Sequence, residues 1–297
     1  MIKNSILFFS DTEKTIRNYR SELMHLIYLN KCEVKIATLR NLHLKFFNIL
    51  YCSLIISSNM RANLVSLSLF FFKKKLIIIN GLGRLKEFKL LRKIFFCLLL
   101  YSFRTKIIVQ NYRDYRWLRL HNVNCTFIMG SGGRRFDVTH KKKEWVVISR
   151  DSKIKAQEKS IVSFASLFLN NTNKLIFYGI DSDSNLNKKI KSYSVFNGFV
   201  NPKEFFLESC NFFQPDGYAE GFPHTLADAI MSGCNICISH KQYIQLGIYK
   251  LKPKKSVFKN FIMLDSKNND KLSESLSSEE VNKKYLLAIK EIIDFEL

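Results

Sequence analysis

Short apolar strands alternate with helical segments from the start of the chain, and this alternation most restricts the possible fold. A strand is expected over Ser5–Ser10, a helix over about Glu13–Asn30 and a strand over Glu33–Leu39. Further strands are expected over Ser53–Ser57 and Lys75–Asn80. A β-α-β order predicts a parallel sheet covered by helices, and ligands bind at the carboxyl ends of such strands.

A second α/β pattern follows Gly130-Ser131-Gly132-Gly133, a stretch typical of a domain linker and of a backbone that approaches a phosphate or sugar closely. Its first elements are a strand over Trp145–Ser149, a helix over about Ala156–Asn170 and a strand over Lys174–Tyr178. A chain of 297 residues with 47% hydrophobic content fits two domains. We expect a first domain over 1–140 and a second over 141–297, the latter closed by a helix over Ser275–Phe295.

The net charge of +22 is concentrated in the first half of the chain. Residues 1–143 contain 27 Lys and Arg against 7 Asp and Glu, whereas residues 144–297 are nearly balanced. A basic half can bind nucleic acid or an anionic bilayer surface, or can simply be solvated.

The segment Phe212–Ser239 combines a strand, an acidic glycine-containing turn and a helix over about Pro223–Met231, then a strand over Cys234–Ser239. Unsatisfied amides and the dipole at a helix start favour an anionic ligand. Glu220 and Asp228 lie eight positions apart, and a helical path would turn both toward that ligand. Two carboxylates beside such a helix suggest a sugar nucleotide as the ligand. The backbone amides would bind its phosphates, and the carboxylates would accept hydrogen bonds from its hydroxyl groups.

Two cations follow the first strand of the second domain. Arg150 stands at the strand end and Lys155 comes five residues later. An Arg fork and a Lys point charge at this spacing can converge on one diphosphate, although isolated surface cations are usually solvated.

The order EGFP, Leu226, Asp228, Ala229, Met231, Gly233 resembles the E-x7-E region of the retaining glycosyltransferases of family 4. Arg150 and Lys155 are similar to the two cations of that family's GRLxxxKG element, and Val195–Val200 resembles its VxFLGxV strand and turn. Asp228 stands where the family has Glu, and Asn235 where it has Pro.

The resemblance extends through the first half. IIINGLGRL, then VQNYRDYRWL, then MGSGGRRFDV look like the GLG, FQNxDD and GSGVD elements of polysaccharide-type members. Ligand binding at the carboxyl ends of parallel strands makes Arg20, Asn80 and Gly81 acceptor-side candidates, and the resemblance adds Asn111. Asn80 stands where many relatives have His. The FQNxDD element ends in two acidic residues; Asp114 matches one of them, and Arg113 stands in place of the other.

The resemblance implies an α/β protein of the GT-B type, with two Rossmann-like domains facing a central cleft. It implies a retaining, metal-independent hexosyl- or N-acetylhexosaminyltransferase in bacterial cell-surface polysaccharide synthesis. The donor would be a UDP-sugar co-substrate, no other cofactor is expected, and the acceptor would be a glycan or a polyprenyl-pyrophosphate-linked sugar.

The same resemblance assigns roles to individual residues. Arg150 and Lys155 would neutralise the departing diphosphate, and Glu220 would position the donor sugar. Asp228 would contact the ribose. The remaining donor-side residues would be Gly132, Gly221, Phe222, Pro223, Thr225 and Leu226.

The segment Phe88–Arg104 carries cations around a broad apolar surface. It could lie flat on a membrane, or it could be covered by the sheet, and Arg61 and Lys73-Lys74-Lys75 could extend a basic surface beside it. The longest apolar runs reach about half the roughly 20 residues that span a bilayer. With no leader pattern, we expect a cytoplasmic protein bound peripherally to the inner face of the plasma membrane.

Metal and redox chemistry have weak signals. Asp181-Ser182-Asp183 has the DxD pattern of metal-dependent transferases, but it falls where family 4 has a glycine-rich loop. Cys234 and Cys237 form a CxxC without a second pair, inside an expected buried strand. Seven scattered cysteines favour a reducing compartment over a disulfide framework.

Two alternatives compete with the transferase. The basic half could bind the phosphates of a nucleic acid. Aromatic side chains that stack on bases must be exposed, whereas the Phe residues here lie in apolar runs typical of a core, so we expect no nucleic acid partner. A catalytically silent transferase would explain the departures at Asp228 and Asn80.

Overall fold

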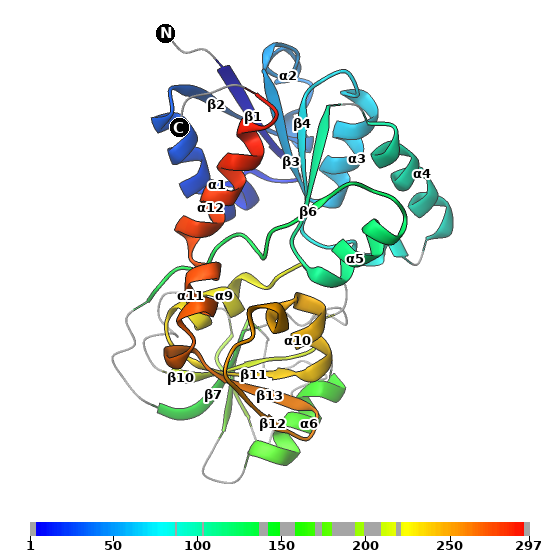
Figure 1. The fold of residues 1–297 in the computed structure, drawn as a ribbon. Coiled ribbons are helices and arrows are strands. Elements are labelled where there is room, and N and C mark those ends of the chain that lie inside the picture. Colours follow the sequence, from blue (N-terminus) through cyan, green and yellow to red (C-terminus); the bar gives the residue numbers. More distant parts are fainter. Residues whose placement is uncertain are drawn as a thin grey trace. The chain divides into compact units, whose positions relative to one another are not determined.

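The computed structural model describes residues 4–86, 88–102, 104–136, 142–148, 158–169, 174–179, 194–198, 209–217 and 221–293. Its backbone forms two compact units, one of residues 1–131 with 278–297 and one of residues 132–277 (Figure 1). Each unit is built around its own sheet of mostly parallel strands. None of the helices in the described part combines the length and apolar character needed to cross a bilayer.

Unit 1 contains a six-stranded parallel sheet in the order β2-β1-β3-β4-β5-β6. Its strands are β1 (Asn4–Ser10), β2 (Cys32–Thr38), β3 (Leu54–Ser58), β4 (Lys75–Ile79), β5 (Thr105–Val109) and β6 (Thr126–Phe127). Successive side chains of β1 are buried on opposite faces, Ile6 and Phe8 in one core cluster and Leu7 and Phe9 in another. Burial on both faces explains the continuous apolar runs of these strands.

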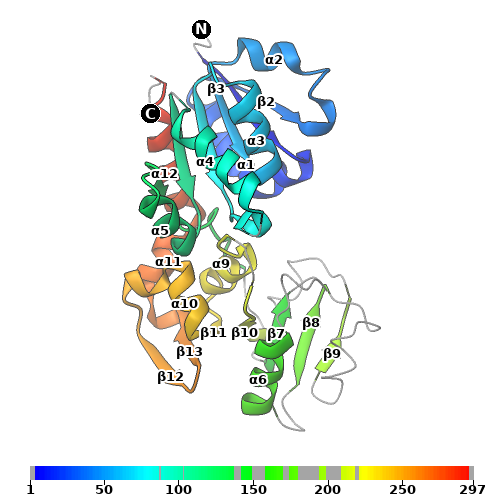
Figure 2. The same cartoon turned by 90° about the vertical axis from the view of Figure 1, so that its right-hand side faces the viewer.

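Helices cover both faces of this sheet (Figures 1 and 2). They are α1 (Glu13–Leu29), α2 (Phe46–Tyr51), α3 (Met60–Leu69), α4 (Lys89–Leu100), α5 (Tyr112–Leu120) and α12 (Ser278–Lys290), with short 3-10 turns at Leu39–Asn41 and Gly83–Lys86. Residues of α1 and α12 share a core cluster with Ile6 and Phe8, whereas α2 to α5 contribute to clusters on the opposite face.

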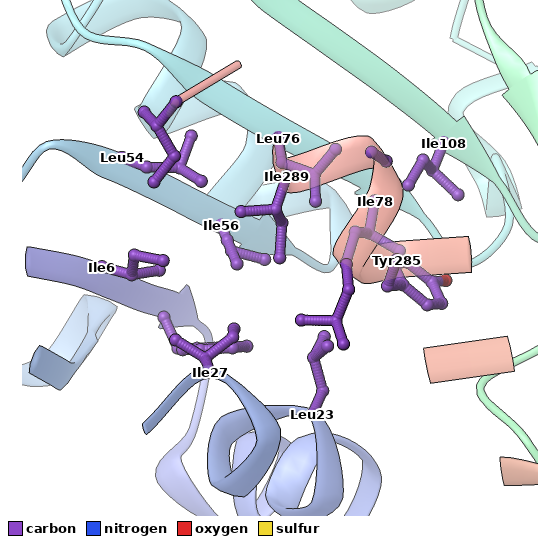
Figure 3. Close-up of a cluster of buried hydrophobic side chains, with 14 of the residues drawn as sticks. Ile6, Leu23, Ile27, Leu54, Ile56, Leu76, Ile78, Ile108, Tyr285 and Ile289 are labelled. Carbon is purple, nitrogen blue, oxygen red and sulfur yellow. The ribbon is translucent and has the colours of Figure 1, made fainter. Parts of the chain in front are cut away.

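The last helix, α12, belongs to unit 1, whereas the expected domain boundaries put it in a second domain of 141–297. The single helix expected over Ser275–Phe295 is divided into α11 (Asp270–Leu276) and α12, with Ser277 between them. Figure 3 shows Tyr285 and Ile289 of α12 packed with Leu23 and Ile27 of α1. The apolar stripe of α12 is therefore buried against the first sheet, 150 residues or more along the chain from its packing partners.

Unit 2 contains a seven-stranded sheet in the order β12-β13-β11-β10-β7-β8-β9. Its strands are β7 (Lys142–Ile148), β8 (Leu175–Tyr178), β9 (Ser194–Phe196), β10 (Ser209–Gln214), β11 (Asn235–Ser239), β12 (Lys255–Phe258) and β13 (Phe261–Asp265). The pairs β11–β13 and β12–β13 are antiparallel, and the other pairs are parallel.

The helices described in unit 2 are α6 (Glu158–Phe168), α9 (His224–Met231), α10 (His240–Leu246) and α11, with 3-10 turns at Ile248–Leu251 and Ser266–Asn268. The core contains stacked aromatic rings, with Phe164 of α6 4.0 Å from Phe213 of β10 between ring centroids. The expected strands and helices of this unit are confirmed within a few residues of their ends where the structure describes them.

Candidate functional site

The order of the unit 2 strands defines where a ligand would bind. From β7 the chain adds β8 and β9 on one side, then returns to β10 on the other side of β7 and continues to β11. The strand order therefore reverses between β7 and β10, and parallel α/β sheets bind ligands outside the carboxyl ends of the strands at such a point. The strand β7 ends at Ile148, two positions before Arg150 in the sequence. Arg150, Lys155, Glu220 and Asp181-Ser182-Asp183 lie outside the described residues.

The helix α9 begins close to the end of β10, as the sequence predicted. Pro223 is its N-cap, without a side-chain hydrogen bond to the first turn. The first intrahelical bond runs from the amide of Ala227 to the carbonyl of Pro223 (3.2 Å), so the three preceding amides have no intrahelical acceptor. Such amides favour an anionic oxygen. Gly221 and Thr225 are half-buried beside this start, while Phe222 and Leu226 are buried and anchor it.

Asp228 lies in the middle of α9 and is 6% exposed. Its Oδ1 accepts a hydrogen bond from the backbone amide of Arg134 at 2.8 Å. The Oγ of Ser232, one turn later, accepts from the amide of Phe136 at 3.0 Å. One face of α9 thus holds the segment 134–136 in place, which is a positioning role for Asp228 that its motif did not predict.

Two glycines allow that segment to approach α9. Gly132 is buried and has φ +87°, a left-handed conformation that suits glycine. A Cβ on Gly133 would lie 2.5 Å from the backbone C and O atoms of Ala227 and 2.9 Å from Cγ of Met231. The amide of Gly133 also donates to the carbonyl of Leu276 at 2.7 Å. The glycine-rich stretch is therefore packed tightly against α9, the helix that carries Asp228.

A second polar cluster at the carboxyl edge of unit 2 was not among the predicted site residues. Asp216, two residues after β10, accepts a hydrogen bond from the hydroxyl of Ser239 at the end of β11. Ser239 in turn accepts from the amide of Gln242 at 3.1 Å and so caps α10. The amide of Asp216 donates to Oγ of Ser160 on α6 at 3.3 Å. The sequence signals for this cluster were Asp216, directly after one apolar run, and Ser239, the last residue of the next expected strand.

Three acceptor-side candidates lie at the carboxyl edge of the unit 1 sheet. Asn80 follows β4, and its Nδ2 donates to Oδ1 of Asn59 at 2.9 Å. Nδ2 of Asn59 donates to Oγ of Ser10 at 3.1 Å, so one chain of polar groups joins the ends of β4, β3 and β1. Gly81 is half-buried beside Asn80. Asn111 follows β5 two residues after its end and is 2% exposed.

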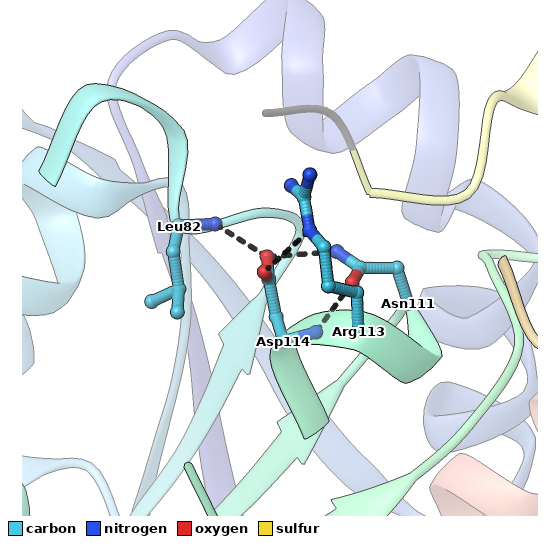
Figure 4. A network of polar contacts seen from close by, with 4 residues as sticks. All are labelled: Leu82, Asn111, Arg113 and Asp114. Atoms are coloured by element: carbon cyan, nitrogen blue, oxygen red, sulfur yellow. Dashed lines mark hydrogen bonds and ion pairs between the residues drawn. The ribbon is translucent and has the colours of Figure 1, made fainter. Parts of the chain in front are cut away.

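The carboxylate of Asp114 fixes the relative positions of these loops (Figure 4). It is fully buried, and its Oδ2 accepts from the amide of Leu82 and from Nδ2 of Asn111, both at 2.8 Å. Asn111 also caps α5, because its Oδ1 accepts from the amide of Asp114 at 2.8 Å. Nε of Arg113 lies 3.4 Å from the second carboxylate oxygen. Asn111 and Asp114 therefore hold the turn after β4 against the start of α5.

Arg20, the fourth candidate, is buried between α1 and α12. Its guanidinium carbon lies 4.5 Å from the ring centroid of Tyr285, and its Nη2 is 3.4 Å from the Tyr285 hydroxyl. That hydroxyl also accepts from Nε2 of Gln110 at 3.0 Å and donates to the carbonyl of Gly130 at 3.3 Å. Nη1 of Arg20 is buried and has no hydrogen-bond acceptor among the described residues. The contacts that the structure shows for Arg20 are thus those that hold α12 on unit 1.

The cysteine pair has the environment of core residues. Cys234 and Cys237 are both buried, and burial raises the pKa of the Cys237 thiol far above its usual range. A thiol of raised pKa is a poor nucleophile and a poor metal ligand, because both roles need the thiolate. Across the described ranges, the side chains of His, Cys, Asp and Glu form no cluster that could hold a metal ion.

Several solved structures resemble this chain along nearly its whole length. HepE of Anabaena, in its complex with UDP, matches 97% of this chain and 100% of its own with a TM-score of 0.67 and 12% sequence identity. The lipopolysaccharide outer core galactosyltransferase WaaB matches 97% and 100% of the two chains, with a TM-score of 0.61 and 10% identity. AviGT4, a glycosyltransferase of avilamycin A biosynthesis, matches 97% and 98%, with a TM-score of 0.61 and 7% identity.

These likenesses show the fold. The chain is an α/β protein of the GT-B type, as its sequence predicted. Sequence comparison finds no matching family model and no matching curated protein. At identities of 7% to 12%, these similarities establish the architecture alone.

Proposed function

We propose that this protein is a retaining glycosyltransferase that transfers a sugar from a UDP-sugar, without a metal ion, to a glycan or polyprenyl-pyrophosphate-linked acceptor. One observation carries the proposal: α9 is the helix that follows β10, a strand at which the strand order of unit 2 reverses, and the sequence Glu220-Gly221-Phe222-Pro223 precedes it. A helix start at that position suits an anionic donor. The GT-B neighbours support it, since HepE has been solved with UDP and with UDP and glucose.

In the proposed mechanism, different residues of unit 2 bind the diphosphate and the sugar of the donor. Arg150 and Lys155 neutralise the diphosphate as the bond between C1 of the sugar and the diphosphate oxygen breaks. The acceptor hydroxyl oxygen forms the new bond to C1 on the same face, and its proton passes to the leaving diphosphate oxygen. Glu220 orients the donor sugar through its hydroxyl groups. The amides after Phe222 and the hydroxyl of Thr225 contact phosphate or sugar oxygens.

Asp228 contributes to this site in two ways. Its hydrogen bond from Arg134 holds the glycine-rich segment against α9. In the proposed complex its carboxylate also accepts from the ribose, as the resemblance implies. Gly132 lets the backbone of that segment turn beside the donor.

The acceptor binds at the carboxyl edge of unit 1 in this proposal. Asn80 and Gly81 supply the amide and backbone groups that contact it, and Asp114 holds the turn that carries them through Leu82. The enzyme acts in cell-surface polysaccharide synthesis at the inner face of the plasma membrane, where it associates peripherally.

A donor screen tests the proposal. Purified protein is mixed with UDP-, GDP- and CMP-sugars, and thermal shift and sugar-nucleotide hydrolysis are measured. We expect stabilisation and slow hydrolysis with a UDP-sugar. Stabilisation by no sugar nucleotide would refute a donor site in unit 2.

Two substitutions test the assigned residues. Glu220→Ala and Lys155→Ala should each abolish transfer while circular dichroism and melting temperature stay as in the wild type. Glu158→Ala and Lys159→Ala are matched controls, because these exposed residues of α6 remove the same charges elsewhere in unit 2. Near-normal turnover by Glu220→Ala or Lys155→Ala would contradict the mechanism.

A further inference from the structure

The outer face of α4 is apolar and exposed. Phe95 and Leu99 face the core, as expected for a helix that covers a sheet. Leu90, Ile94 and Tyr101 are exposed instead, and the fraction reaches 76% for Tyr101. The segment therefore covers the sheet and also presents apolar side chains outward.

More exposed apolar side chains lie where the helices of unit 1 end. In a parallel α/β sheet, each helix that leads into a strand ends at the edge where the strands begin. The large apolar side chains exposed at or near these helix ends, or at the start of the six-residue helix α2, are Tyr28, Leu29, Phe46, Phe47, Tyr51, Leu69, Phe71, Phe72, Leu100, Tyr101 and Leu120. The expectation that the Phe residues of apolar runs form the core is wrong for Phe71 and Phe72, whereas Phe70 beside them is buried.

Contacts join several of these side chains into one surface. The rings of Phe46 and Phe70 lie 6.4 Å apart between centroids, which places α2 beside the end of α3. Nζ of Lys75 is buried and donates to the carbonyls of Phe70 and Phe71 at 3.0 and 3.1 Å. The amide of Lys75 donates to the carbonyl of Arg104 at 3.1 Å, which places the end of α4 next to this loop. Figures 1 and 2 both draw α2 at the same end of unit 1 as the chain's N-terminus.

We define the amino-edge surface as the exposed apolar residues of α2, of the loop after α3 and of the end of α4, with the cations between them. The apolar members are Phe46, Phe47, Tyr51, Phe71, Phe72 and Tyr101, and the cations are Lys45, Lys73, Lys74 and Arg104.

The charge of this edge has one dominant sign. Nζ of Lys73 donates to the carbonyl of Cys52 at 2.9 Å and lies 6.0 Å from the ring centroid of Phe72, so its charge stays beside the aromatic residues. A groove next to them is lined by Lys74, Arg104 and Lys106, together with Glu291, which pairs with Lys106. The cations therefore outnumber the acid in this groove. Lys75, expected on the same basic surface, is fully buried and does not contribute.

We propose that the amino-edge surface binds an anionic lipid bilayer, with the aromatic side chains in the interface and the lysine and arginine head groups at lipid phosphates. Aromatic and aliphatic side chains interleaved with cations are suited to this boundary, where long basic side chains extend toward the head groups. A protein partner would require acids opposite the same cations, and a nucleic acid bound through its phosphates would leave the exposed phenylalanines in water. This surface locates the peripheral association of the proposed function on unit 1.

Vesicle co-sedimentation of the full chain tests the proposal, in buffer without donor or acceptor, so its outcome is independent of the UDP-sugar screen. The vesicles are phosphatidylcholine alone or a mixture of phosphatidylcholine with the anionic lipid phosphatidylglycerol. We expect binding to the anionic vesicles that weakens with salt. Lys45→Gln with Lys74→Gln should weaken it about fivefold for each cation removed.

The apolar contribution is tested with Phe47→Ser, Phe71→Ser and Tyr101→Ser combined in one variant. It should bind anionic vesicles at least tenfold more weakly than the wild type, with an unchanged circular dichroism spectrum. The control variant combines Ile244→Ser, Val257→Ser and Leu287→Ser, which are exposed apolar residues elsewhere, and should bind like the wild type.

Three results would overturn the proposal. The first is wild-type binding by the Phe47, Phe71 and Tyr101 variant. The second is no vesicle binding by the wild type together with a dimer that this variant dissociates, which would make the surface an interface between copies. The third is binding of a single-stranded oligonucleotide that this variant loses, without binding to vesicles.

Discussion

Replacing Gly133 by Ala tests whether the glycine-rich segment is built to pack on α9. Gly133 does not have a positive φ, so alanine is compatible with its backbone and the effect is purely steric. The new Cβ would lie 2.5 Å from backbone atoms of Ala227, and ordinary van der Waals contact begins near 3.4 Å. The segment or α9 must therefore move by about 1 Å.

That movement has a cost that can be estimated. Overpacking a well-packed site costs roughly 1–3 kcal/mol. The same shift stretches the hydrogen bond from the amide of Arg134 to Asp228, a bond to a charged group worth about 1.5–3 kcal/mol. We expect Gly133→Ala to lower the free energy of unfolding of unit 2 by about 2–5 kcal/mol. If α9 forms the donor site, a displacement of about 1 Å should also reduce transfer by up to about a hundredfold.

Urea unfolding, with tryptophan fluorescence and hydrogen exchange of the Arg134 amide, measures this effect. Met231→Ala combined with Gly133→Ala should not restore stability, because the shorter contacts are with the backbone of Ala227. Gly83→Ala is the control, since nothing lies within 4 Å of its Cβ and only its φ of +53° is unfavourable. An unfolding midpoint of Gly133→Ala equal to that of the wild type would refute the packing argument.

Three further substitutions have expected outcomes. Asp228→Ala should destabilise unit 2 by roughly 1.5–3 kcal/mol in urea unfolding, whereas Asp228→Asn, which keeps an oxygen for the Arg134 amide, should cost less; equal losses would contradict the positioning role. Burial lowers the pKa of Lys75 from 10.5 to about 8, so the unfolded chain binds its proton more tightly and this group destabilises the fold below pH 8. The free energy of unfolding of the wild type, measured in urea, should therefore rise relative to that of Lys75→Met between pH 8 and 10.5. If the difference between the two proteins is the same at every pH, burial does not shift the pKa of Lys75. Tyr285→Phe should lower the stability of unit 1 by about 1–2 kcal/mol in the same assay, because Gln110 and the carbonyl of Gly130 lose a partner; no loss would mean that Tyr285 acts through packing alone.

Much of the fold could be predicted because its signals are local. Short apolar runs separated by helical segments predicted strands in both sheets, and the structure confirms these within a few residues, although β5, β6 and β12 were not among them. The GT-B type was predicted from motif order, and similarity to HepE and WaaB along nearly the whole chain confirms it. The start of α9 was predicted at Pro223 and is observed at His224, because proline marks a helix start regardless of tertiary context.

The site was less predictable because its side chains have partners far along the chain. Asn80 and Gly81 were expected at the end of a strand and lie after β4, whereas Asn111 was named from its motif alone and is buried as a helix cap. Nothing near Arg20 in the sequence indicates that it stacks on Tyr285, 265 residues later. The roles of Arg150, Lys155 and Glu220 remain predictions.

The sequence by itself determined the parallel sheets, the order of the motifs and the position of a helix start after β10, because hydrophobic periodicity and proline act over a few residues. Tertiary structure decided that α12 joins unit 1 and that Asp228 holds the amide of Arg134, 94 residues away. It also decided that Lys75 at the start of β4 is buried while Phe71, four residues earlier, is exposed. The sequence around an apolar residue or a carboxylate does not identify the residue that it will contact. Burial and hydrogen bonding are settled only when distant segments pack, since the cost of an unpaired polar group or an unfilled space depends on what lies opposite.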